Sequence, residues 1–272
     1  MLDGVLAGSS GLRTAILLLG LPLLVGCGRP TSLGDGVWGS LGNTRGVRSG
    51  PVEMAEVSQE EWTVSRERLA RLREHQPKRP YVERVRLSIV EPHTRTRYEA
   101  RGAVAVDPGR AARMIMVGPA GTTALDLWVT KERFRFAVPG IKLEKRGGTD
   151  PNEMRGLPVG FLRWWFLSPL GGRLLMGRST PGESAWVLKD GPAIVTVRTD
   201  GQHFFALRRE GERLEGIEWL GRLLVPSAGS RGHYIEGRLG LRVDIVVEEV
   251  LDTAPDPAAF EDPDAPSEGT TL

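Results

Sequence analysis

The chain is poor in cysteine and in long apolar runs. Its 272 residues include a single cysteine, Cys27, and a lone cysteine cannot form an intrachain disulfide bridge, which excludes a disulfide-stapled fold. A transmembrane helix needs about 20 apolar residues. The apolar run near the N-terminus, residues 15–25, is only eleven residues long, which is the length of the hydrophobic part of a signal peptide rather than of a membrane span.

The chain also lacks the short motifs of catalysis and metal binding. The four histidines occur singly, and the sequence contains no H-E-x-x-H, G-x-S-x-G, S-x-x-K or P-loop pattern. We therefore predict no metal, no cofactor and no catalytic residues. A carboxylate pair is defined in space rather than by spacing, so an exported hydrolase with an unrecognised site stays open as an alternative. No strand carries the interleaving of basic and aromatic residues that is typical of a known nucleic-acid reader, and the compartment indicated below is wrong for nucleic acid, so we predict no nucleic-acid partner.

What the N-terminus does contain is a pattern for export and lipidation. Residues 1–26 read as a signal peptide that ends in Leu24-Val25-Gly26 before Cys27. This ending resembles the lipobox of bacterial lipoproteins, in which cleavage precedes a cysteine whose thiol becomes a thioether to diacylglycerol. The alternative is a small hydrophobic residue in an ordinary secretory signal. Lipidation of Cys27 would tether the protein to a membrane without spanning it.

Two polar segments flank a regular central region. Residues 27–56 are rich in Gly, Ser, Pro and Arg and lack apolar periodicity, as expected of a flexible tether. Residues 252–272 are proline-rich and carry six acidic residues and no basic one, which predicts a disordered tail. The intervening region, residues 57–251, is the predicted folded domain.

This domain begins with a helix and continues in strands. Ser58 and Glu61 have the spacing of a capping box, and the segment 58–75 places Trp62, Leu69 and Leu72 on one helical stripe. From residue 81 the apolar period becomes two, in short runs that are separated by turn sequences such as DPG, GPAG and DG. Two sets of strands, before residue 140 and after residue 183, indicate an antiparallel meander, a mainly β fold.

Between the two strand sets lies an apolar segment, GLPVGFLRWWFLSPLGG, whose residues 161–167 predict a helix that is apolar on nearly every side. This helix and the 58–75 helix are little cover for about ten strands. The sheet must therefore close on its own side chains or leave an apolar cavity. We predict that such a groove is lined by nine apolar residues: Met114, Leu125, Leu127, Phe134, Phe136, Leu162, Trp164, Trp165 and Phe166. For each of these residues, an ordinary place in the core is the alternative.

The segment YEARGAVAVDPGRAARMIMVGPAGTTALDLWVT, residues 98–130, resembles the LolA/LolB superfamily of lipoprotein carriers and outer-membrane receptors. The shared features are a strand with a glycine (Gly102), a strand ending in Gly-Pro-x-Gly (118–121) and a strand with alternating leucines (Leu125, Leu127). Residues 154–172 look like the helical segment that caps the cavity in that family. The resemblance implies an unclosed antiparallel β-barrel of about eleven strands with a few lid helices.

The resemblance also implies a function. A protein of this kind is expected to bind acyl chains of lipids or lipoproteins in an apolar groove, by burial of apolar area at about 25 cal/mol per Å². With Cys27 lipidated, we expect an outer-membrane anchor, a domain facing the periplasm and a role in lipoprotein localisation, without catalysis. The alternative from another class is a structural or assembly lipoprotein of the cell envelope, which has a filled barrel and docks envelope protein partners.

Overall fold

The computed structural model describes residues 57–118, 121–150, 152–221, 224–237 and 240–264. These residues make up the folded domain and the first part of the C-terminal tail. The predicted signal peptide, the lipidation site Cys27, the tether 27–56 and the end of the tail, 265–272, lie outside the described residues.

The domain is one antiparallel sheet whose two edges do not pair with each other, in the order β6-β5-β4-β3-β2-β1-β13-β12-β11-β10-β9-β8-β7. This confirms the unclosed antiparallel fold that the sequence predicted. The strands are β1 (Tyr81–Val90), β2 (Arg97–Asp107), β3 (Ala111–Val117), β4 (Thr123–Thr130), β5 (Phe134–Val138), β6 (Leu143–Gly147), β7 (Arg173–Thr180), β8 (Glu183–Asp190), β9 (Ala193–Thr199), β10 (His203–Glu210), β11 (Arg213–Leu220), β12 (Arg231–Glu236) and β13 (Leu241–Leu251).

The sheet has thirteen strands in the described residues, so the expected number of about eleven was too low. The strand-like runs in the sequence did not reveal β6, β7 or β12. All three have a weak alternation of apolar and polar residues. β6 is largely exposed, and in β7 the register with β8 shifts between Leu174 and Met176, which breaks the period of two.

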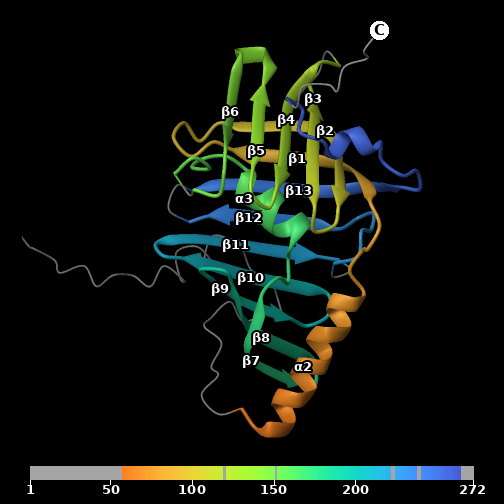
Figure 1. Cartoon of the computed structure of the whole chain (residues 1–272), viewed down its shortest axis with the longest axis vertical. Coiled ribbons are helices and arrows are strands. Elements are labelled where there is room, and N and C mark those ends of the chain that lie inside the picture. Colours follow the sequence, from red (N-terminus) through yellow and green to blue (C-terminus); the bar gives the residue numbers. More distant parts are fainter. Residues whose placement is uncertain (1–56, 119–120, 151, 222–223, 238–239, 265–272) are drawn as a thin grey trace, which may run out of the picture. The chain divides into compact units, whose positions relative to one another are not determined.

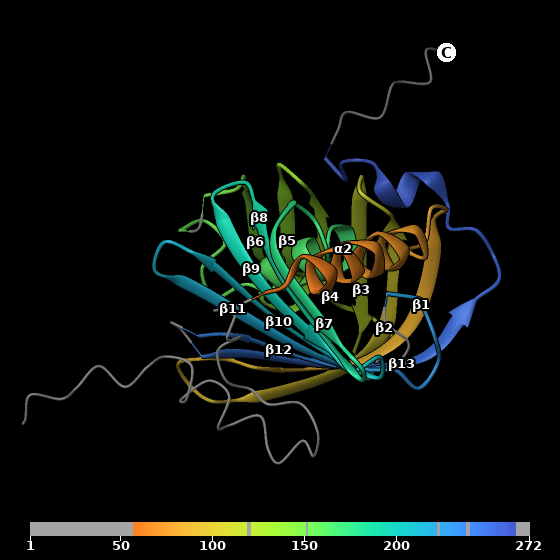
Figure 2. The same cartoon turned by 90° about the horizontal axis from the view of Figure 1, so that it is seen from below.

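Strand order divides the sheet into two halves, which we call the first half (β1–β6) and the second half (β7–β13). Each half follows the chain order, and they meet where β1 pairs with β13. Figure 1 shows β2–β6 running across the direction of β9–β12, and Figure 2 shows the strands arranged around α2 and α3. The sheet therefore curves, and both halves turn one face toward a shared interior.

The inner face of the sheet is set by alternation along the strands. Val85 and Leu87 of β1 are buried, whereas Arg84 and Arg86 are exposed. In β3, Met114 and Met116 face inward and Ile115 does not, as the period of two predicts. Tyr98 has the inward parity of β2 but is 59% exposed, since no described element covers that end of the strand.

The helix α2 (Gln59–Glu74) covers the β7 end of the second half, as Figure 1 shows. Both hydrogen bonds of the predicted capping box are present: Glu61 N donates to Ser58 Oγ, and Ser58 N donates to the Glu61 carboxylate. The helix buries Ser65 and Leu69 and leaves Trp62 and Leu72 half-buried. Trp186 Nε1 donates to the carbonyl of Ser65 at 2.9 Å, which fixes the helix on β8.

The C-terminal segment covers the outer face of the first half. The short 3-10 helix η3 (Pro257–Phe260) buries the ring of Phe260, whose carbonyl accepts a hydrogen bond from Trp128 Nε1 at 3.1 Å. Beyond η3, Asp264 pairs with Arg135 at 3.2 Å. The predicted disorder of residues 252–272 is therefore wrong for this stretch, because one aromatic anchor and a few acidic side chains find partners on β4 and β5.

The connection between the two edges of the sheet is the predicted apolar helix. It consists of α3 (Val159–Phe161) and a π-helical continuation, η2 (Leu162–Leu167). Every side chain of η2 except Arg163 is buried. We call residues 159–167 the plug helix, because it lies between the two halves on the inner face of the sheet.

Candidate functional site

The plug helix is held by aromatic contacts with the second half of the sheet. The rings of Phe161 and Tyr234 lie 5.4 Å apart between centroids, and Trp165 lies 5.2 Å from Phe204 and 4.9 Å from Trp219. On its other side the plug helix contacts β2, β3 and β4 of the first half. One helix therefore fills the space between the two inner faces.

All nine residues predicted to line an apolar groove come together in one buried cluster. Their exposed fractions do not exceed the 9% of Leu125. Five belong to the first half and four to the plug helix: Met114, Leu125, Leu127, Phe134 and Phe136; Leu162, Trp164, Trp165 and Phe166. The sequence thus identified side chains that meet, and the plug helix occupies the space that an external ligand would need.

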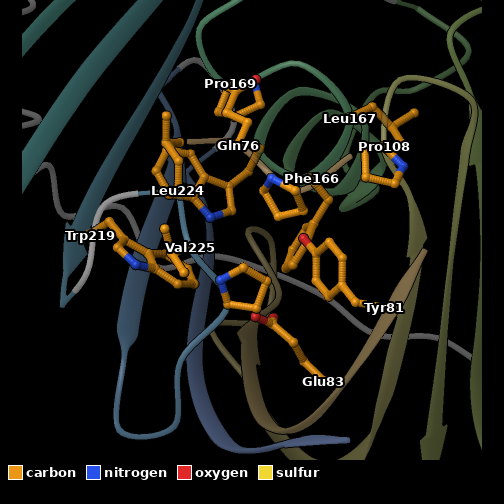
Figure 3. Close-up of a pocket in the computed structure, with 13 residues that line it drawn as sticks. Gln76, Tyr81, Glu83, Pro108, Phe166, Leu167, Pro169, Trp219, Leu224 and Val225 are labelled. Atoms are coloured by element: carbon orange, nitrogen blue, oxygen red, sulfur yellow. The ribbon is translucent and has the colours of Figure 1, made fainter. Parts of the chain in front are cut away.

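A pocket remains on one side of the plug helix, and its lining includes Tyr81 and Glu83 of β1 together with Trp165 and Trp219. Figure 3 shows Tyr81, Glu83 and Trp219 around it. About 520 Å³ of it, counting the open mouth, is free of atoms. We call it the aromatic pocket. Its wall is completed by proline and aliphatic residues with Gln76 and Phe166: Pro77, Pro108, Leu167, Pro169, Leu224, Val225 and Pro226.

Glu83 is the unusual residue of the aromatic pocket. It shares the inward parity of Val85 and Leu87, and only 2% of its surface is exposed. Burial raises the pKa of its carboxyl from 4.5 to about 7. A sequence signal for this residue exists, since a glutamate interrupts an otherwise apolar inward row in YVERVRLSIV, but the predicted groove included apolar residues alone.

A second pocket, which we call the charged pocket, lies on the other side of the plug helix, beside Gly160 and Trp164. About 1280 Å³ of it is free of atoms, again counting its open side. The residues that line it include cationic and anionic side chains in similar number: Lys131, Arg163, Arg208 and Arg213; Asp190, Glu210 and Glu215. The four charged residues of β10 and β11 in this pocket, Arg208, Glu210, Arg213 and Glu215, were not predicted, because charged residues in strands usually mark a solvent-exposed face.

An ionic network centred on Glu215 forms the floor of the charged pocket. Its carboxylate accepts hydrogen bonds from Tyr234 Oη at 2.6 Å, Arg213 Nη2 at 2.9 Å and Arg208 Nη1 at 3.1 Å. Burial and the nearby Glu215 charge raise the pKa of Tyr234 well above 10, so its hydroxyl stays a hydrogen-bond donor. The hydrogen bonds to Glu215 join β10, β11 and β12, and Gly160 of the plug helix lies directly against the Glu215 carboxylate.

Polar contacts hold the plug helix and the segment after it. Arg163 Nε donates to the carbonyl of Thr130 at 2.8 Å, and its Nη atoms donate to that of Gly148 at 3.3 Å. Burial, with a smaller effect of nearby arginines, lowers the pKa of Arg163 to about 10. After the helix, Arg73 of α2 donates to the carbonyl of Leu170 at 3.1 Å.

Neither a metal centre nor a membrane-spanning helix is found in the described part of the chain. No group of three or more His, Cys, Asp or Glu side chains among these residues has the geometry to hold a metal ion. None of the described helices has the length and apolar character needed to cross a bilayer.

Comparison with known proteins gives structural similarity only. No family model matches the chain, and no curated protein is similar to it in sequence. A LolA superfamily protein from Nitrosomonas europaea is 12% identical, with a TM-score of 0.46 over 73% of this chain and 97% of that one. A DUF1329 family protein from Desulfovibrio piger is 11% identical, with a TM-score of 0.43 over 74% and 97%.

A third solved structure is a putative outer membrane lipoprotein-sorting protein domain from Vibrio parahaemolyticus. It is 8% identical, with a TM-score of 0.40 over 73% of this chain and 96% of that one. Of these three solved structures, the one from Nitrosomonas europaea is described as a LolA superfamily protein.

Proposed function

We propose that this protein is a membrane-anchored, non-catalytic lipoprotein that binds acyl chains of lipids or lipoproteins between the two halves of its sheet. The observation that carries the proposal is the plug helix: the two inner faces close on one apolar segment rather than on each other. Acyl chains would take the place of the plug helix. The nine predicted groove residues would then contact the ligand or move aside with the helix.

The way in which the plug helix is attached supports an exchange of this kind. Glycines flank the plug helix on both sides, Gly156 before it and Gly172 after it, with positive φ angles of 73° and 91°. The side chains that it buries are mostly apolar, and each methylene of an acyl chain contributes about 0.8 kcal/mol on burial. Burial of the ligand can therefore offset the apolar burial that the helix gives up when it moves. A π-helical turn, as in η2, is also frequent at functional sites.

The anchor and the compartment are part of the same proposal. We propose that Cys27 is lipidated and that the domain faces the periplasm from the outer membrane, with a role in lipoprotein localisation. The support is the lipobox-like sequence before Cys27. Cys27→Ser should release the protein from the membrane fraction, and persistent membrane association of that variant would contradict the anchor.

A loosened plug helix tests the binding mechanism. A Cβ on Gly160 would lie 2.1 Å from Glu215 Oε1, which is too close for both atoms to keep their positions. Gly160→Ala should therefore displace the plug helix away from β11. Gly140→Ala is the matched control, because a Cβ at Gly140 meets no atom within 4 Å. We would titrate a fluorescent fatty acid into full-length chains that also carry Cys27→Ser, and then displace it with palmitate.

The expected result is binding by all three chains, with at least threefold higher affinity for Gly160→Ala. Equal affinity of the three would contradict displacement of the plug helix. Cooperative unfolding would show that the three chains are folded. If none of the folded chains binds the fatty acid, the proposal is overturned. That result would favour the second candidate, a structural or assembly lipoprotein, which the filled interior of the sheet also fits.

A further inference from the structure

The aromatic pocket contains a buried carboxylate with an oxygen that no described residue pairs. Glu83 Oε2 has no hydrogen-bond partner among the described residues. Burial is the cause of the raised pKa of Glu83, with no neighbouring cation among them acting to lower it. An unpaired buried charge lowers the free energy of unfolding by several kcal/mol. A carboxylate at this position therefore destabilises the fold unless a ligand pairs with it.

The second half of the sheet fully pairs one of its buried carboxylates, Glu215, although Glu218 Oε1 and Glu236 Oε2 there also lack a hydrogen-bond partner among the described residues. Glu215 is as deeply buried as Glu83 and accepts hydrogen bonds from two arginines and a tyrosine. Both carboxylates line pockets, but no cation or hydroxyl among the described residues reaches Glu83 Oε2, and Figure 3 shows Glu83 in the aromatic pocket below Tyr81. A local departure from the apolar pattern that nothing in the described structure compensates is typical of a functional site.

The residues around Glu83 define what its partner would be. Four aromatic side chains line the same pocket, Tyr81 from β1, Trp165 and Phe166 from the plug helix, and Trp219 from β11. Aromatic faces attract cations through their quadrupole, and aromatic cages are a recurrent way to bind amines and quaternary ammonium groups. A carboxylate among aromatic rings combines a counter-ion with cation–π contacts and apolar contact for methyl or methylene groups.

We propose that the aromatic pocket binds an organic ammonium group, with Glu83 as its counter-ion and Tyr81, Trp165, Phe166 and Trp219 as its walls. The ligand class is an aliphatic amine or quaternary ammonium, either free or as the headgroup of a lipid. This inference goes beyond acyl-chain binding and does not depend on it. Its walls include the plug helix in the position described here, so the pocket exists while that helix stays in place.

Calorimetric titration with short probes tests the proposal. The probes are hexyltrimethylammonium, its neutral analogue hexanol and its anionic analogue hexanoate, each titrated into full-length chains carrying Cys27→Ser. We expect hexyltrimethylammonium to bind at least tenfold more tightly than either analogue. Glu83→Gln keeps the shape of the side chain and should weaken ammonium binding at least tenfold, without changing the affinity for hexanol.

Two controls separate the site from general effects. Glu99→Gln removes an exposed carboxylate of β2 and should leave ammonium binding unchanged. Binding should also strengthen between about pH 6 and pH 8, because the pKa of Glu83 is about 7 and the quaternary probe does not titrate. Tyr81 is the other titratable group in the described lining of the pocket, and burial and the Glu83 charge hold its pKa well above 10.

A sedimentation experiment distinguishes the two sources of the ligand. Vesicles of phosphatidylcholine retain the Cys27→Ser chain more than its Glu83→Gln variant if the ligand is a headgroup. If the vesicles retain the two chains equally while the soluble probe binds tightly, the ligand is a free amine. Failure of hexyltrimethylammonium to bind, or equal binding by Glu83→Gln, would overturn the ammonium site and leave the acyl-chain proposal untouched.

Discussion

The two halves of the sheet present very different inner faces to the same helix. The first half offers methionine, leucine and phenylalanine from β3, β4 and β5. The second half offers aromatic rings and, beside them, the network of Glu215 with Arg208, Arg213 and Tyr234. Apolar side chains are held by close packing without directional bonds, whereas buried ion pairs and hydrogen bonds also require a defined geometry. Both halves therefore position the plug helix, the second through aromatic rings and the first through the carbonyls of Thr130 and Gly148, which accept hydrogen bonds from Arg163.

The largest effect should come from breaking the ionic network. Glu215→Ala leaves Arg208 and Arg213 buried without their shared partner, so we expect a loss of about 4 kcal/mol in the free energy of unfolding. In the first half, Leu127→Met conserves volume and should cost less than about 1.5 kcal/mol. Urea unfolding measures both. Equal losses would remove the distinction between the halves.

The outer face of the first half gives the next prediction. Phe260 is buried against β2 and β3, and its carbonyl holds the indole of Trp128. Phe260→Ala should lower the free energy of unfolding by about 3 kcal/mol, as for other large buried aromatic residues. Asp264→Asn, which removes only peripheral ion pairs, should cost less than about 1 kcal/mol. Similar unfolding midpoints for Phe260→Ala and the wild type would mean that the C-terminal segment does not stabilise the domain.

The unpaired carboxylate of the first half predicts a pH dependence. The pKa of Glu83 is about 7 in the folded state, above the 4.5 of a free glutamate, so the folded state binds more protons in that range. Stability contributed by the protonated form is present below about pH 4.5 and is lost as the pH rises through 7, by about 3 kcal/mol. The difference in unfolding free energy between the wild type and Glu83→Gln, measured from pH 5 to pH 8, isolates this effect. A constant difference would show that Glu83 does not titrate in this window.

The smallest effect concerns the helix that covers the end of the second half. Ser58→Ala removes the N-cap hydrogen bond to Glu61 N and should cost about 1 kcal/mol. Thr63→Ala is a useful control, since its hydroxyl donates only to the carbonyl of Gln59 within the same helix. Thermal unfolding followed by far-UV circular dichroism would compare them, and an equal shift of the two midpoints would contradict a specific role for the cap.

Much of the local structure was predictable because it depends on near neighbours in the chain. The capping box at Ser58, the alternation of Met114 and Met116, and the apolar 161–167 helix all follow from short-range spacing. The strands β6, β7 and β12 were missed because exposure, a register shift and glycine obscure their period. Tail residues 257–264 were missed because their partners on β4 and β5 are distant in sequence.

By itself, the sequence determined the fold class, the alternation of each strand with clear periodicity and nine of the apolar residues that meet in the interior. Only the tertiary structure decided that the 159–167 helix fills that interior. It also decided that Glu215 gains hydrogen-bond donors from neighbouring strands, while Glu83 Oε2 has none among the described residues. The reason is that hydrophobic burial is non-directional and can be read from composition and period, whereas the pairing of a buried charge depends on which strands lie side by side.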